Sequence, residues 1–544
     1  SSCTVSCSCG DRVHDLQSGG MRTRGLLFRT ALKKSAICAL LLPLTQAFVP
    51  SQSPQPRPRH SIKLGLMDDI GKMAARAGIT TTTPPGSPLF AGASAPSWQK
   101  LREDATATPT GRAWEDMKRL WEKGGGPPHT DAKLRLFGTT GEPRVTLYRD
   151  TAAWCPYCQK VWMMFEEKRI PYRIEKINMR SYGEKPSWYL NMVPSGLLPA
   201  IKLDGRLITE SLVIMQTLEA SFPGQRRMLP DRGTAEFDQA VRLLQLEREL
   251  FGWWCQFVFR PGAGAQQAFE KTVDQVDKAL AASEGPWFLP PYGSGEGDGF
   301  SLVDLTYVPH LERMAASTAY WKKGLRIRGN KRWPAVNRWF DALERRESYM
   351  ATKSDFYTHV KDIPPQYGDG VSVAAAAEAA ARIDGRDGSW DLPLPPLRDP
   401  EQSLEPVLEE NDPGEEAARH EAAAKLTSNA EAVVRFACRG AGRSSGWSLY
   451  AGRAPLADPN AQPNEEVAAD VDYVLRQVSS ALLTGSTAEA EGVLRAAAAA
   501  GGRSQDTAGA IRACLTYLIE RVGVPRDMSY PAARQLRAHL GWAM

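Results

Sequence analysis

The sequence predicts an α/β domain followed by an all-helical domain, with a further small α-helical domain at the C-terminus and a disordered presequence at the N-terminus. Three observations predict this organisation. Strand and helix patterns alternate between residues 144 and 220, only helical patterns occur from 234 to 360, and two apolar stripes near the C-terminus have helical spacing. A chain of 544 residues is also too long to fold around a single hydrophobic core, because domains of about 150 residues are usual.

The α/β domain is predicted over residues 141–224. In its first strand, residues 144–149, the apolar Val145 and Leu147 alternate with Thr and Tyr. A helix is expected to begin at Pro156, because the first helical position needs no N–H donor. The pattern continues with a strand at Tyr172–Ile177, a helix at Pro186–Met192, a hairpin over residues 198–208 and a helix at Ser211–Ala220. This order of elements is that of a thioredoxin-like domain.

The second domain, residues 234–360, is predicted to be helical throughout. Ser301 and Asp304 form a capping-box pattern, in which each side chain satisfies a backbone N–H group at a helix start. Residues 361–428 are predicted to be a linker, since their middle is acidic and rich in proline. A helical domain of unknown role is expected over residues 429–544, based on two stripes: Val467, Val471, Val474, Leu475, Val478 and Leu482, then Ile511, Leu515, Leu518, Ile519 and Val522.

Residues 1–67 are predicted to be a presequence. After Met21, several basic residues precede the apolar run Ala36–Leu44, and the segment Thr45-Gln46-Ala47, which ends in a small residue, follows that run. No acidic residue occurs between this segment and Asp68. This pattern resembles the bipartite presequence of algal plastids, so we expect a plastid location; secretion or an endomembrane lumen is the alternative. The apolar run is shorter than the ~20 residues of a membrane-spanning helix, so no stable membrane insertion is expected. Residues 68–140 are expected to be a linker with short helices.

The charge distribution gives no reason to expect a nucleic-acid partner. The formal net charge is +5, but residues 16–67 hold eight Lys or Arg and no Asp or Glu. The rest of the chain is therefore nearly neutral, whereas nucleic-acid-binding domains carry a basic patch or stripe.

Cys155 and Cys158 form a Cys-X-X-Cys pair at the predicted start of a helix, directly after a strand. Free N–H groups and the positive helix end favour a thiolate there, so Cys155 is the predicted nucleophile. Cys158 could resolve a mixed disulfide from one turn away, or it could be a core residue beside Val161 and Trp162. No metal site is expected, because the pair has no second Cys pair or His cluster nearby.

Several motifs between residues 144 and 357 occur in a characteristic order. They are Trp154-Cys155-Pro156-Tyr157-Cys158, Ile177-Asn178-Met179 with Lys185-Pro186-Ser187-Trp188-Tyr189, Asn191 to Pro199, Glu210-Ser211, and the Ser301 and Asp304 capping box. Together they resemble the glutathione transferase superfamily, most closely its omega class, with a dithiol active site of the glutaredoxin type. The sequence departs from that class in Cys158, in a one-residue shift at Pro194-Ser195-Gly196, and in its long terminal extensions.

The resemblance implies a thioredoxin-like glutathione-binding domain and an all-helical glutathione transferase C-terminal domain, with glutathione as cosubstrate. It implies that Lys185 contacts glutathione, that Pro199 follows a cis peptide bond, and that the Leu198 backbone pairs with the cysteinyl part of glutathione. Glu210 and Ser211 match the pair that holds the γ-glutamyl group; a carboxylate and a helix N-terminus suit an ammonium and a carboxylate respectively.

The predicted function is glutathione-dependent thiol transfer: removal of glutathione from mixed disulfides, or reduction of disulfides or dehydroascorbate, without a metal. The predicted partners are glutathione and small or protein disulfides, and the family resemblance implies a homodimer. Two alternatives are conjugation of glutathione to electrophiles and a redox-regulated binding or scaffold protein of the same fold. An acceptor pocket is expected between the domains, where several aromatic residues either line the pocket or belong to the core: Trp253, Trp254, Phe257, Tyr307, His310 and Trp321.

Overall fold

A computed structural model describes residues 89–90, 94–292, 297–322, 324–399, 403–443, 461–487 and 503–544. The predicted presequence, residues 1–67, lies outside the described residues. No helix in the described part of the chain is long and apolar enough to cross a membrane.

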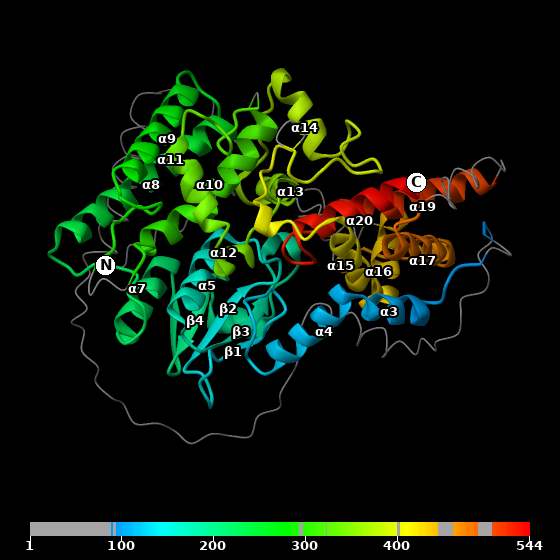
Figure 1. The fold of residues 1–544 in the computed structure, drawn as a ribbon, viewed down its shortest axis with the longest axis horizontal. Coiled ribbons are helices and arrows are strands. Elements are labelled where there is room, and N and C mark those ends of the chain that lie inside the picture. Colours follow the sequence, from blue (N-terminus) through cyan, green and yellow to red (C-terminus); the bar gives the residue numbers. More distant parts are fainter. Residues whose placement is uncertain are drawn as a thin grey trace.

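The predicted α/β domain is built on one five-stranded sheet (Figure 1). Its strands are β1 (Leu134–Arg135), β2 (Val145–Asp150), β3 (Tyr172–Ile177), β4 (Ala200–Leu203) and β5 (Arg206–Thr209), in the order β1-β3-β2-β4-β5. β2 pairs with β3 in parallel and with β4 antiparallel, so β2 is the central strand. Val145 and Leu147 are fully buried, as the predicted alternation requires.

Helices connect these strands in the predicted order. They are α5 (Pro156–Lys168) after β2, η1 (Arg180–Tyr182) and α6 (Ser187–Met192) after β3, and α7 (Ser211–Ser221) after β5. The proline at the first position of α5 confirms the predicted helix start. The thioredoxin-like arrangement is therefore confirmed, and it places the N-terminal end of α5 directly after the central strand.

The second domain is helical, as predicted. Its helices are α8 (Ala235–Val258), α9 (Ala265–Ala281), α10 (Leu302–Trp321), α11 (Pro334–Leu343), α12 (Glu347–Met350) and α13 (Phe356–Tyr367). The Ser301 and Asp304 capping box is present at the start of α10. Helix α10 packs against α5, α8 and α13, so one hydrophobic core runs through both domains.

The aromatic residues considered for a pocket wall are mostly core residues. Trp254 and Tyr307 are fully buried, and Phe257, His310 and Trp321 are nearly so. Of the six, only Trp253 is half-buried. Their helical spacing therefore reflects packing of α8 and α10.

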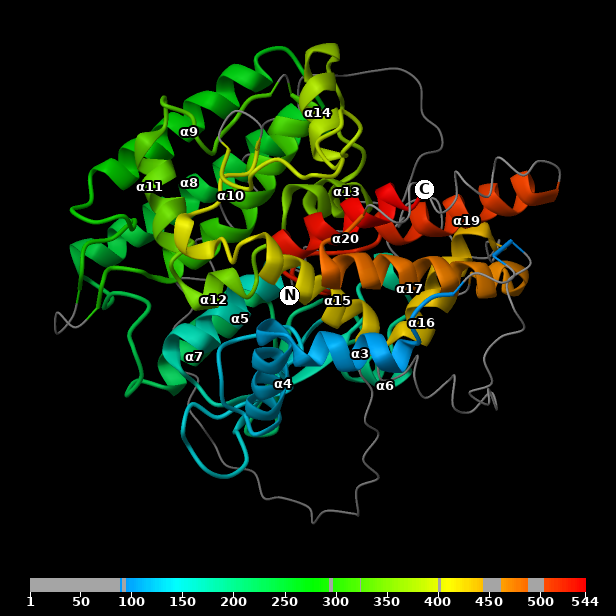
Figure 2. The same cartoon turned by 45° about the vertical axis from the view of Figure 1, so that its right-hand side comes forward.

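A third, helical unit combines both extensions of the chain. Its helices are α3 (Trp98–Ala107), α4 (Pro109–Glu122), α15 (Glu415–Ser428), α16 (Ala430–Ala437), α17 (Ala468–Thr484), α19 (Arg503–Ile519) and α20 (Tyr530–Trp542), with short turns η4 (Cys438–Ala441) and η5 (Glu465–Val467). Figure 2 shows α3 and α4 alongside α15 and α17, and these helices are in contact. The apolar stripes predicted for α17 and α19 form its core.

The segment predicted as a linker, residues 361–428, has several contacts with the helical domain. It contains the end of α13, η2 (Ala374–Ala376), α14 (Ala377–Ile383), η3 (Glu409–Asn411) and all of α15. The buried Glu405 accepts a hydrogen bond from the Phe356 N–H (2.8 Å), and Tyr320 donates to Asp384 (2.8 Å). Acidic side chains therefore anchor this segment to α10 and α13, which its composition did not indicate.

Candidate active site

Cys155 is the N-cap residue of α5, in a loop that Asp150 organises. Asp150 ends β2, and its Oδ2 accepts hydrogen bonds from the N–H groups of Trp154 (2.7 Å) and Cys155 (3.0 Å). This carboxylate is buried, so these charge-assisted bonds are among the stronger ones a protein makes. The loop from β2 to α5 is thereby closed around Asp150.

The second domain fixes the same loop from the opposite side. Arg313 of α10 donates to the Trp154 carbonyl oxygen, and its guanidinium lies 4.2 Å from the centroid of the Trp154 ring. Trp154 Nε1 donates to Nδ1 of His359 of α13 at 3.1 Å. Both partners are buried, so the position of Cys155 depends on packing between the two domains.

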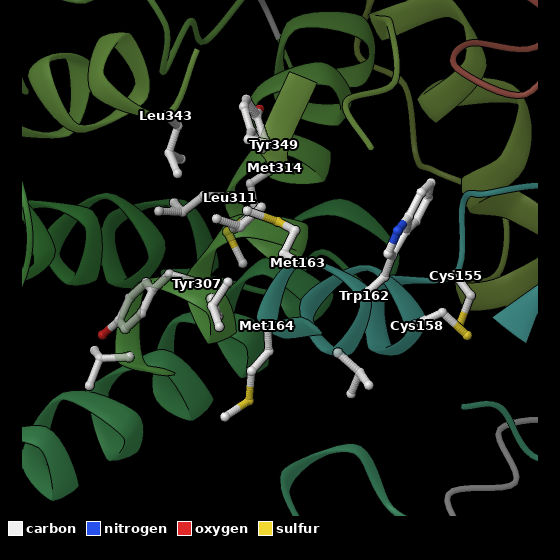
Figure 3. Packing of buried hydrophobic residues seen from close by; sticks show 14 of the residues in the cluster. Cys155, Cys158, Trp162, Met163, Met164, Tyr307, Leu311, Met314, Leu343 and Tyr349 are labelled. Carbon is white, nitrogen blue, oxygen red and sulfur yellow. The ribbon is translucent and has the colours of Figure 1, made fainter. Parts of the chain in front are cut away.

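Cys155 and Cys158 lie together at the N-terminal end of α5 (Figure 3). Cys155 Sγ lies 4.0 Å from the Leu198 carbonyl oxygen, and the Leu198–Pro199 peptide is cis, as the resemblance implied. Cys155 is 9% exposed, whereas Cys158 is 1% exposed, and their sulfur atoms lie within 4.8 Å of each other. Burial, followed by the interaction with Cys155, raises the pKa of Cys158 well above its usual value, so Cys158 stays protonated beside Cys155.

Asp150, Cys155 and Cys158 also have the spacing of potential metal ligands. One possible ligand atom of each residue lies within 4.8 Å of those of the other two. Among the described residues, this is the group of His, Cys, Asp or Glu side chains that lie close enough together to share a metal ion. Asp150 Oδ2 is already engaged by two backbone N–H groups. The Asp150 carboxylate thus already has partners in its own loop.

Lys185 lies in the loop before α6, within electrostatic range of the two cysteines. Its Nζ donates to the Asn178 carbonyl oxygen at 2.6 Å, and burial lowers its pKa, while the cysteines oppose that change electrostatically. The turn after α6 needs glycine at position 196, because φ there is +64 and an added Cβ would contact the Lys185 and Leu190 side chains. The Lys185 ammonium is thus held near the site by its neighbours.

Glu210 and Ser211 lie at the start of α7. Glu210 is the N-cap residue, its side chain is exposed and makes no capping bond, and its φ is +65. A non-glycine residue rarely adopts this conformation, which concentrates at ligand-binding positions. The carboxylate therefore remains available to a ligand at the N-terminus of α7.

Three residues that hold the Cys155 loop were not predicted: Asp150, Arg313 and His359. Asp150 had a usable signal, since it directly follows the predicted strand and precedes Cys155 by five positions. Arg313 and His359 are 159 and 205 residues from Trp154, a separation that leaves no local pattern.

Comparisons with known proteins match this part of the chain. Residues 154–221 match the family model of the glutathione S-transferase N-terminal domain, and residues 233–342 match that of the C-terminal domain. Glutathione S-transferase DHAR2 of Arabidopsis thaliana is 27% identical over 213 residues, which cover 38% of this chain and 86% of that protein. The chloroplastic Glutathione S-transferase DHAR3 of the same organism is 25% identical over 211 residues, 37% of this chain and 69% of that protein. The solved structure of glutathione transferase Omega 3C from Trametes versicolor is 25% identical, with a TM-score of 0.33, and covers 44% of this chain and 95% of that one.

Proposed function

We propose that this chain, which matches the glutathione S-transferase domain models over residues 154–221 and 233–342, is a glutathione-dependent thiol transferase in which Cys155 is the nucleophile. The observation that carries the proposal is the position of Cys155 at the N-cap of α5, opposite the Leu198 carbonyl and beside Cys158. A helix N-terminus favours the thiolate, which is the attacking form.

Glutathione binds along the first domain in this proposal. The Leu198 backbone pairs with its cysteinyl part, as an extended peptide pairs with an exposed strand. Glu210 meets the γ-glutamyl ammonium, and Ser211 with the N–H groups of α7 meets the adjacent carboxylate. Lys185 supplies positive charge near the sulfur atoms.

The reaction proceeds by two thiol-disulfide exchanges. Cys155 thiolate attacks the glutathionyl sulfur of a mixed disulfide, the S–S bond of the substrate breaks, and the acceptor leaves as a thiolate that takes a proton from water. A second glutathione thiolate then attacks the Cys155–glutathione disulfide and releases oxidised glutathione. Small disulfides and dehydroascorbate are the other oxidants proposed.

Conjugation of glutathione to electrophiles is the rival reaction. That chemistry activates the glutathione thiol itself, whereas a cysteine at the same position forms a disulfide with it. The three activities are separable on one preparation of the full chain: glutathione with a mixed disulfide, with dehydroascorbate, and with an aryl halide. We expect turnover with the first or second substrate and its loss in Cys155→Ser; activity with the aryl halide alone would refute the proposal.

A plastid location and a homodimer complete the proposal. The chloroplastic relative and the basic N-terminal residues support the first. Fluorescent tagging of the complete precursor tests the location, and light scattering of the purified chain tests the oligomeric state.

A further inference from the structure

Lys160 is a buried cation without an anionic partner. It lies on α5, five residues after Cys155, and is 3% exposed. Its Nζ lies 5.1 Å from the centroid of the Tyr157 ring, and within the described part of the chain it makes no hydrogen bond or ion pair. Lys168 on the same helix is also buried, but its Nζ lies 2.9 Å from Glu219. An unpaired buried ammonium costs stability, so its presence needs another explanation.

The surroundings of Lys160 carry an excess of positive charge. Glu247 is the nearby carboxylate of α8, but Arg248 already binds it at 2.6 and 2.9 Å and His310 of α10 at 2.5 Å. Two further groups within electrostatic range can carry negative charge: Cys155 and the exposed Glu210 at the N-cap of α7. Burial lowers the pKa of Lys160 to about 8, and Arg248 acts in the same direction, so the ammonium form still predominates at neutral pH.

Lys160 lies on the side of Cys155 that faces the second domain. The residues proposed for glutathione, Lys185, Leu198, Glu210 and Ser211, all belong to the first domain. Tyr157 and Lys160 lie one helical turn apart, and the Tyr157 ring is 6.0 Å from that of His310 on α10. In a mixed disulfide, the group attached to glutathione therefore extends past Tyr157 and Lys160.

We propose that Lys160 is a catalytic residue that stabilises the negative charge on the sulfur leaving the acceptor. This inference rests on the proposed thiol transferase function. As Cys155 attacks, the electron pair of the breaking S–S bond moves onto the acceptor sulfur, and the Lys160 ammonium offsets that charge before water protonates it. Such a charge develops only in the transition state, so its stabilisation increases turnover. The favoured substrates are mixed disulfides of basic alkyl thiols, such as glutathionylated protein cysteines.

The test compares two mixed disulfides of glutathione that differ in the leaving thiol. One carries 2-mercaptoethanol, whose thiolate is strongly basic, and the other carries 4-nitrothiophenol, whose thiolate is weakly basic because the ring delocalises its charge. Lys160→Met is expected to reduce kcat/KM roughly 10- to 100-fold for the first and less than about threefold for the second. Lys160→Arg should restore the first activity to within about fivefold, because the guanidinium keeps the charge. Lys202→Met, an exposed lysine of β4, is the control and should change neither.

The pH dependence gives a second readout. Below pH 8 the Lys160 ammonium is charged and favours the basic leaving group; as pH rises through about 8 that advantage should fade in the wild type. It should persist in Lys160→Arg, whose side chain stays charged.

Three results would overturn the assignment of Lys160: an equal loss with both disulfides, a loss confined to glutathione affinity, or no loss. Lys160→Gln, with thermal midpoints for every variant, covers the case in which the Met variant does not fold. A wild-type chain inactive with both disulfides would instead refute the proposed function itself.

Discussion

Cys158→Ser decides whether the enzyme uses one thiol or two. Cys158 is 1% exposed on the face of α5 that carries Val161 and Trp162, so a hydroxyl there should cost about 1–3 kcal/mol of stability whatever its role. Its sulfur also lies within 4.8 Å of the Cys155 sulfur, which is close enough for an intramolecular attack after a small side-chain rotation. Stability therefore does not separate the two roles, and activity must.

If Cys158 resolves, the variant should still reduce glutathione mixed disulfides within about threefold of wild type, because glutathione itself releases Cys155. Reduction of a protein disulfide should fall at least tenfold, roughly, because it requires attack by a second thiol of the same chain. Both activities and the thermal midpoint are measured on one preparation, with Cys255→Ser on α8 as a thiol-removal control. Intact protein-disulfide activity in Cys158→Ser would refute the dithiol mechanism.

Three further predictions concern single side chains. Cys155→Ser should abolish thiol transfer, since a serine hydroxyl stays protonated at neutral pH, and residual turnover above about a tenth would reveal another nucleophile. Glu210→Ala should weaken glutathione binding, measured by calorimetry, with little change in turnover at saturating glutathione; the reverse pattern would contradict its role. Burial raises the pKa of Glu312 from 4.5 to about 7, so the folded state keeps a proton that the unfolded chain releases, and stability falls by about 3 kcal/mol as pH rises across that interval. Glu312→Gln should remove this loss, so its thermal midpoint should fall less than that of wild type between pH 5 and pH 8; parallel falls would contradict the assignment.

The sequence predicted the elements that local patterns encode. The strand at residues 172–177 coincides with β3, and Pro156 and Ser301 stand at the helix starts where proline and capping chemistry place them. Residues close to Cys155 in the sequence, above all Asp150, could also have been predicted from local patterns. In each case the determining interaction lies within a few residues.

Contacts between distant segments could not be predicted in the same way. Helix α3 is polar overall and was assigned to a linker, yet Trp98 donates to Asp472 of α17 at 2.6 Å. A tryptophan in a polar segment gives no indication of its partner 374 residues away. The same limit applies to Arg313 and His359, whose partner Trp154 lies in another domain.

These distant contacts connect the C-terminal extension to the active-site loop. Arg537 of α20 forms a buried ion pair with Asp355, the N-cap of α13, at 2.6 Å, and the Val524 N–H donates to Thr358 at 3.1 Å. The next residue of α13, His359, accepts the hydrogen bond from Trp154 beside Cys155. Replacing Arg537 by Met would leave the Asp355 carboxylate buried without its cation, which destabilises a fold by roughly 3–5 kcal/mol. The extension is thus part of the body that positions Cys155, although the two matched family domains end before α13 begins.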